Sequence, residues 1–203
     1  MLAIVDYGVG NLFSLKSSLY HIGVECEVTG EASRIEAAER VILPGVGAFG
    51  DAMDKLRETG LIPVLQREAS EKPFLGICLG MQLLFRKSYE YGEHAGLGLL
   101  DGEVADLRGA LDDPSLKVPH MGWNSLDFRR EDPWLSDIPN GAYVYYVHSF
   151  YAKDCEADIL AMSQYGNVAV PGIVRRGNVC GTQFHPEKSG ETGLNILRAF
   201  AKL

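Results

Sequence analysis

Short apolar runs alternate along the first half of the chain with longer segments whose apolar residues recur every three or four positions. Four runs have the length and continuity of buried strands: residues 2–5, 24–28, 41–43 and 74–77. Between the first two, apolar residues recur at helical spacing from Leu12 to Ile22, and Gly23 offers a stop. Strands that alternate with helices favour a parallel sheet covered on both faces. The first half therefore predicts a doubly wound α/β fold.

Helix signals mark the segments between the later strands. Asp51 is placed to cap a helix that runs through Leu56, and Pro63 to open a helix that ends near Ser70. Residues 79–85 continue directly from the fourth apolar run and predict the first turns of another helix. A strand that turns sharply into a helix is therefore expected at that join.

The second half has shorter, more alternating apolar segments. Its predicted strands are residues 125–128, 142–150, 159–163, 168–174 and 179–184. A closing helix follows, with Leu194, Leu197 and Phe200 on one face. No repeat or linker interrupts the chain, so we expect one domain over residues 1–203, with a more antiparallel region added by the second half.

Composition and charge narrow the classes of partner. The chain has 203 residues, of which 46% are hydrophobic and 23% charged, values that exclude wholesale disorder. A net charge of −8 argues against nucleic acid, which requires a basic patch. No apolar run approaches the roughly 18 residues that cross a bilayer. No two of the four cysteines form a C-x-x-C pair, so we expect no zinc site, no disulfide framework and a reducing, cytoplasmic compartment. The sequence also lacks a Walker loop and a full dinucleotide fingerprint, and we expect no cofactor.

The chemistry centres on Cys78, which lies at the predicted strand-to-helix join with Gly76 and Gly80 two residues away on either side. Gly-x-Cys-x-Gly at such a corner is the cysteine form of a nucleophile elbow, which holds the nucleophile at strained backbone angles. The start of the following helix favours a thiolate, and the N–H of Leu79 is placed to bind an oxyanion. A lone cysteine is more commonly a core residue, so this motif needs support from elsewhere.

A second polar corner supplies that support. His185 also follows a predicted strand, and Glu187 lies two residues farther on, across Pro186. Proline fixes φ and offers no competing N–H, so Glu187 can accept from Nδ1 of His185 and leave Nε2 to face the sulfur. His148, near the end of another predicted strand, is read as a structural histidine and kept out of the catalytic set.

Two glycine-rich loops follow strands as well. Residues 44–50 contain three glycines at the end of a strand, where open α/β sheets bind ligands. Gly8 and Gly10 suggest a dinucleotide loop, but the third glycine of that fingerprint is replaced by Phe13. We therefore expect the loop at residues 44–50 to belong to the site, and not the loop that contains Gly8 and Gly10.

Taken together, the segment 44–47, Cys78 and the segment 185–187 resemble the class I (triad) glutamine amidotransferases. The resemblance implies that Cys78 attacks the side-chain amide of glutamine, that His185 protonates the departing ammonia and that Glu187 orients His185. It implies an oxyanion hole from Leu79, Val46 and Gly47. The implied substrate-binding residues are Gly45, Gln82, Glu90, Ser149 and Phe150. Many members have tyrosine at position 150.

Three further segments, 6–12, 119–124 and 146–150, resemble members of this family that act as separate glutaminase subunits in histidine biosynthesis. That resemblance implies a heterodimer with a (β/α)8-barrel cyclase that consumes the ammonia. The residues implied at the contact are Trp123, Asn124, Tyr145 and Lys188.

Other functions are compatible with the same motifs. A cysteine peptidase uses a similar triad, because a triad alone does not specify the substrate. The alternatives also include an amidotransferase subunit of another pathway and an interaction subunit that keeps the fold without activity. Assays with glutamine and with peptides separate the peptidase, and reaction of Cys78 with a glutamine-like electrophile separates the inactive subunit.

Overall fold

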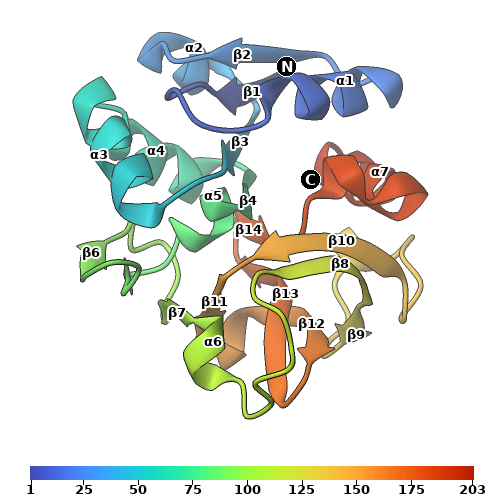
Figure 1. The fold of residues 1–203 in the computed structure, drawn as a ribbon. Coiled ribbons are helices and arrows are strands. Elements are labelled where there is room, and N and C mark those ends of the chain that lie inside the picture. The colour runs from blue at the N-terminus through green and yellow to red at the C-terminus, as the bar shows by residue number, and fades with distance from the viewer.

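The structure, a computed structural model, describes residues 1–203 and contains a central eight-stranded sheet (Figure 1). In spatial order its strands are β2 (Cys26–Thr29), β1 (Leu2–Val5), β3 (Arg40–Gly45), β4 (Phe74–Cys78), β14 (Val179–Thr182), β13 (Val168–Arg176), β12 (Ile159–Tyr165) and β9 (Asp127–Phe128). The first five are parallel, and the last three continue the sheet in antiparallel pairs. The predicted parallel first half and antiparallel extension are therefore confirmed.

Helices cover both faces of the parallel strands. α1 (Leu12–His21) and α7 (Gly190–Phe200) lie on one face, and α2 (Ala32–Ala37), α3 (Phe49–Thr59) and α4 (Ile62–Glu71) lie on the other (Figure 1). Successive side chains of a strand point to opposite faces, so Ile4 joins the core under α1 and α7 while Val5 joins the core under α3 and α4. This alternation accounts for the continuous apolar runs: each residue is buried on one face or the other.

The second half adds two small sheets beside the central one. β8 (His120–Ser125) pairs with β10 (Tyr143–His148), and β11 (Phe150–Lys153), β7 (Glu103–Asp106), β5 (Lys87–Ser88) and β6 (His94–Ala95) form a four-stranded sheet. The remaining elements are the short helices α5 (Leu79–Gln82), α6 (Leu107–Ala110), η1 (Pro133–Leu135), η2 (Glu156–Asp158) and η3 (Pro186–Lys188).

The helix predicted over residues 79–85 is shorter than expected. Only Leu79–Gln82 is helical, because the carbonyls that would continue the helix bond to another segment. The Leu83 carbonyl accepts from Leu97, and the Leu84 carbonyl accepts from Leu99 and Leu100. The incoming chain lies so close that a Cβ on Gly96 would be 2.2 Å from the Phe85 carbonyl oxygen.

The predicted cap at Asp51 is wrong. α3 begins at Phe49, so Asp51 lies in its first turn, where its charge still favours the helix dipole. The free N–H of Phe49 donates instead to the Glu90 carboxylate at 2.7 Å. A side chain 41 positions away thus replaces the local cap.

Several strand boundaries also differ, because the chain changes partner strands. The segment predicted as one strand over residues 142–150 is split at Ser149, where the chain leaves β8 and pairs with β7. The strand predicted over 125–128 is replaced by β8 and β9, which belong to different sheets and meet at the buried Leu126. β2 begins two residues later than expected, since the N–H of Val24 still bonds to α1 at Leu19.

β3 runs two residues beyond the predicted 41–43, through Pro44 to Gly45. Its last register pair joins Gly45 to Cys78 of β4. The glycine loop therefore starts directly beside the proposed nucleophile.

None of the helices is long and apolar enough to cross a membrane.

Candidate active site

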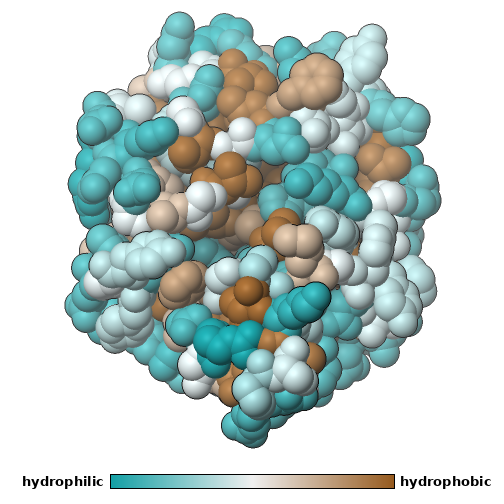
Figure 2. Space-filling view, in the orientation of Figure 1, coloured by the Kyte–Doolittle hydropathy of each residue, from teal (hydrophilic) through white to brown (hydrophobic).

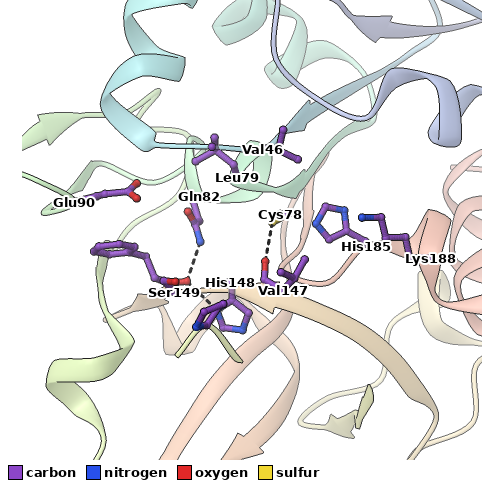
Figure 3. A pocket seen from close by; sticks show the side chains of 13 residues that line it. Val46, Cys78, Leu79, Gln82, Glu90, Val147, His148, Ser149, His185 and Lys188 are labelled. Atoms are coloured by element: carbon purple, nitrogen blue, oxygen red, sulfur yellow. Dashed lines mark hydrogen bonds between the residues drawn. The ribbon is translucent and has the colours of Figure 1, made fainter. Parts of the chain in front are cut away.

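The predicted catalytic residues meet at one edge of the central sheet. β3, β4 and β14 are neighbours in the parallel part, and Cys78 ends β4 while His185 follows β14. Carboxyl ends of parallel strands lie at the same edge of a sheet, where open α/β folds bind ligands. Figure 3 shows Cys78 between His185 and Gln82 in the resulting cleft. Figure 2 shows this face of the molecule hollowed near its middle.

The backbone at Cys78 has the strained conformation expected of a nucleophile elbow. Its φ of 54° and ψ of −112° place a non-glycine residue outside the ordinary allowed regions. The neighbouring glycines permit this turn, since a Cβ on Gly76 would lie 2.6 Å from the Gly80 carbonyl oxygen. A Cβ on Gly80 would lie 1.9 Å from the carbonyl oxygen of Leu43. Both glycines are therefore required by close backbone packing.

Polar groups surround the Cys78 sulfur, although the residue is only 7% exposed. The carbonyl oxygen of Val147 and the side-chain nitrogen of Gln183 each lie 3.9 Å from Sγ. α5 is a single turn, so the nearby cation matters more to a thiolate here than the helix dipole does.

That cation is His185. Its Nδ1 lies 2.8 Å from Oε1 of Glu187, and both side chains are 3% exposed. Burial alone would lower the pKa of His185, but its interactions with the Cys78 sulfur and the Glu187 carboxylate outweigh burial and raise that pKa to about 10. The ring is therefore an imidazolium at neutral pH, held by Glu187 and able to give a proton to a leaving group.

The cleft has a volume of about 370 Å³ and brings together most of the predicted site residues. Those that line it are Val46, Gly47, Cys78, Leu79, Gln82, Glu90, Ser149, Phe150, His185 and Lys188. Gly45 and Glu187 lie behind this surface, next to Cys78 and His185 respectively. Trp123, Asn124 and Tyr145 are outside the lining.

Gln82 and Glu90 give one part of the cleft two hydrogen-bond acceptors. The Gln82 amide nitrogen donates to the Phe150 carbonyl at 2.9 Å and to Oε1 of Gln183 at 3.1 Å, which leaves its oxygen free to accept. Burial raises the pKa of the Glu90 carboxyl, and the N–H of Phe49 only partly offsets this. A cationic ligand beside Glu90 would compensate its buried charge.

The glycine loop lies beside the elbow, and its backbone adopts conformations that depend on glycine. A Cβ on Gly45 would lie 2.7 Å from the backbone nitrogen of Gly80, so Gly45 allows the loop to reach the elbow. Gly47 has a φ of +98°, and Val46 between them is 42% exposed. A peptide group flanked in this way can change orientation at modest cost.

Three of the four residues expected at a partner contact lie near each other. The rings of Trp123 and Tyr145 are 6.0 Å apart, and the Tyr145 N–H donates to Ser189, the residue after Lys188. Trp123 is 55% exposed. Asn124 differs, because its side-chain nitrogen is already used within the chain and donates to the Gln164 carbonyl at 2.9 Å.

Sequence reasoning missed several residues of the site. Gln183 lies two positions before His185, and the strand period alone would have placed both on one face. Val147 contributes a backbone carbonyl, for which the sequence carries no signal. Pro119 and His148 also line the cleft.

Comparison with known proteins gives a consistent result. The family model described as "Glutamine amidotransferase class-I" matches residues 3–203. The "Imidazole glycerol phosphate synthase subunit HisH" of Bacillus cereus is 52% identical over 98% of this chain and 93% of its own. The protein with the same description from Lactiplantibacillus plantarum is 52% identical over 100% of this chain and 96% of its own.

Solved structures agree on the fold. A crystal structure titled as a glutamine amidotransferase superposes with a TM-score of 0.74 at 20% identity and covers 99% of both chains. A chain in the structure of PurLQS from Thermotoga maritima gives a TM-score of 0.75 at 22% identity and covers 99% of this chain and 97% of that one. The protein therefore belongs to the class I glutamine amidotransferase family.

Proposed function

We propose that this chain is the glutaminase subunit of imidazole glycerol phosphate synthase. It hydrolyses glutamine to glutamate and ammonia and passes the ammonia to a cyclase subunit in histidine biosynthesis. The observation that carries the proposal is the Cys78, His185 and Glu187 arrangement in a chain about 50% identical, over nearly its full length, to relatives of that description.

The first step is acyl transfer to the sulfur. The Cys78 thiolate adds to the side-chain amide carbon of glutamine, and the carbonyl oxygen becomes an oxyanion. The N–H groups of Leu79 and of the Val46–Gly47 segment stabilise that oxyanion. His185 protonates the amide nitrogen as the C–N bond breaks, which releases ammonia and leaves a glutamyl thioester on Cys78.

The second step returns the enzyme to its starting state. Neutral His185 takes a proton from a water molecule that attacks the thioester carbon, and the collapse of the second oxyanion expels the Cys78 thiolate. Glutamate leaves, and the imidazolium is restored. Glu187 stabilises the charged ring in both steps and keeps Nδ1 occupied, so that Nε2 faces the reacting atoms.

The amino-acid end of glutamine is held on the other side of the cleft. The Gln82 oxygen and the Glu90 carboxylate accept from the substrate ammonium group, and the backbone at Ser149 and Phe150 binds near its carboxylate. Binding at this distance from the reacting amide fixes the orientation of the carbonyl relative to Cys78.

The ammonia goes to a separate (β/α)8-barrel cyclase, with which the chain forms a heterodimer. Trp123, Asn124, Tyr145 and Lys188 lie near that contact. The two steps proposed above require no metal or cofactor.

The test is a purified chain mixed with a cyclase subunit from a relative. Glutamine should support cyclisation of the acceptor, and the rate of glutamate formation should match it. Peptides and other amides should give no turnover. Hydrolysis of peptides in preference to glutamine would favour the cysteine peptidase, and an unreactive Cys78 thiol would favour a non-catalytic subunit.

A further inference from the structure

Two histidines outside the triad are buried next to each other, and one of them, His148, lines the cleft. His120 of β8 and His148 of β10 are register partners across the two-stranded sheet and are 3% and 6% exposed. Nδ1 of His120 lies 3.0 Å from Nε2 of His148. The proposed reaction uses neither ring, so their burial needs another explanation.

The hydrogen bonds of the two rings have a single direction. Nδ1 of His148 lies 2.9 Å from the Phe150 carbonyl oxygen, which can only accept, so this nitrogen carries the proton. Nε2 of His148 then accepts from Nδ1 of His120. Nε2 of His120 is left as an acceptor, and the Asn124 side-chain nitrogen lies 3.4 Å away. Each ring nitrogen therefore has a defined role, and both rings are neutral.

Electrostatics and packing keep the chain of hydrogen bonds in this state. Burial lowers the pKa of His120 to about 4; burial and the nearby His120 lower that of His148 to about 3. The His120 ring stacks on Tyr146 and on Tyr165, with centroids 4.7 Å and 4.1 Å apart. Tyr146 is itself fixed by a hydrogen bond to Ser163 at 2.8 Å.

The series of hydrogen bonds through the two rings ends at the Phe150 carbonyl, which also accepts from a second donor. The Phe150 oxygen accepts from both His148 and the Gln82 side chain, each at 2.9 Å (Figure 3). The position of this carbonyl therefore sets the orientation of the Gln82 amide, whose oxygen remains free to accept. The same peptide group belongs to the segment that lines the cleft at Ser149 and Phe150.

We propose that His120 and His148 are positioning residues for glutamine. Their hydrogen bonds fix the Phe150 carbonyl, and through it the Gln82 side chain that receives the amino-acid end of the substrate. This inference rests on the proposed glutaminase function. It assigns the two rings to substrate binding rather than to the chemical step.

The first test compares His120→Asn with His120→Leu in the complex with the cyclase. Asparagine and leucine have nearly the same shape, but only asparagine can donate to Nε2 of His148 from the place of Nδ1. Loss of one buried hydrogen bond should raise the KM for glutamine roughly 3- to 10-fold in His120→Leu. The kcat should stay within about twofold of wild type, and His120→Asn should restore the wild-type KM.

The ammonium-driven reaction of the same complexes is the control, and it should be unchanged in both variants. Equal KM values in His120→Asn and His120→Leu, or a loss confined to kcat, would overturn the positioning role. A wild-type complex that fails to hydrolyse glutamine would instead overturn the proposed function.

A second measurement does not depend on the folding of a variant. Nitrogen NMR of the two imidazoles in the wild-type chain at neutral pH should find both rings neutral and protonated on Nδ1. A proton on Nε2 of His148, or a charged ring, would be incompatible with the donor and acceptor roles assigned to the two rings and would contradict the proposal.

Discussion

The cleft has two walls that are built in different ways. The first wall is the edge of the parallel sheet, where β3, β4 and β14 end at Gly45, Cys78 and just before His185. The second wall, with Gln82, Glu90 and the Ser149–Phe150 peptide, is assembled from segments far apart in sequence. Three of its hydrogen bonds connect residues that are separated in the sequence by 41, 68 and 101 positions. We infer that the first wall performs the chemistry and the second selects the substrate.

This difference has a physical basis. Strand ends in a parallel sheet are held by hydrogen bonds on both sides, so the reacting groups keep their geometry through the reaction. Recognition of a small zwitterion needs acceptors and donors on several sides of it, which a single sheet edge does not provide. Substitutions in the first wall should therefore lower kcat, and substitutions in the second should raise KM.

Cys78→Ala should have the largest effect, because it removes the nucleophile. Glutamine-driven cyclisation by the complex should fall by more than roughly 10⁴-fold, while ammonium-driven cyclisation stays at the wild-type rate. Paired rate assays with the two nitrogen sources measure this, with Cys26→Ala as the control cysteine. Loss of the ammonium-driven rate in an assembled complex would mean that Cys78 does more than release ammonia.

Glu187→Gln should have the next largest effect. The amide fills the same space but cannot stabilise the imidazolium, so kcat should fall roughly 10²- to 10⁴-fold with little change in KM. Steady-state kinetics check this, and Glu191→Gln on the surface of α7 is the matched control. Unimpaired turnover would remove Glu187 from the first wall.

The partner should act on the first wall through its glycine loop. If the peptide between Gly45 and Gly47 presents an N–H only when the cyclase and its acceptor are bound, kcat should rise roughly 100- to 1,000-fold in that complex. The comparison is between the chain alone, the complex, and the complex with an acceptor analogue. Similar turnover numbers in all three would contradict a switch, and a change only in KM would indicate that binding merely orders the loops.

Glu90→Gln should have a smaller effect, and it should change the KM for glutamine rather than kcat. The neutral amide still accepts from the substrate ammonium but loses the charge, so the KM for glutamine should rise roughly 10- to 100-fold with kcat retained. Glu93→Gln, an exposed neighbour, is the control. A fall in kcat alone would place Glu90 with the chemistry and break the division between the walls.

The pH dependence of the KM for glutamine should also show that Glu90 acts in substrate binding, and it is the smallest of the expected effects. Burial raises the pKa of Glu90, so this carboxylate gains its proton at a higher pH than an ordinary glutamate as acid is added. Protonation removes the charge that attracts the ammonium group, so KM should rise as the pH falls through that pKa. KM measured against pH should show this rise in the wild type and be flat in Glu90→Gln.

The two walls also differ in how far the sequence predicts them. Cys78 and His185 each follow an apolar run, and the glycines around one and the proline beside the other are local signals. The topology of parallel strands then brings the two residues together. The fold class followed from the same pattern, together with the antiparallel extension.

The second wall depends on contacts that no local pattern specifies. The bond from Glu90 to Phe49 moved the start of α3 away from the expected cap at Asp51. The crossing of residues 96–100 over Leu83 and Leu84 ended α5 early. His148 has the sequence context of an ordinary strand histidine, and only its distances to His120 and Phe150 give it a role.

The role of Cys78 as the nucleophile is tested most directly by the mass of the chain quenched in acid during turnover of glutamine. We expect one glutamyl adduct per chain, and proteolysis should assign it to the peptide that contains Cys78. Cys78→Ala should carry none. An adduct on Cys26, Cys155 or Cys180, or sustained glutamine turnover by Cys78→Ala, would contradict a nucleophile at the edge of the parallel sheet.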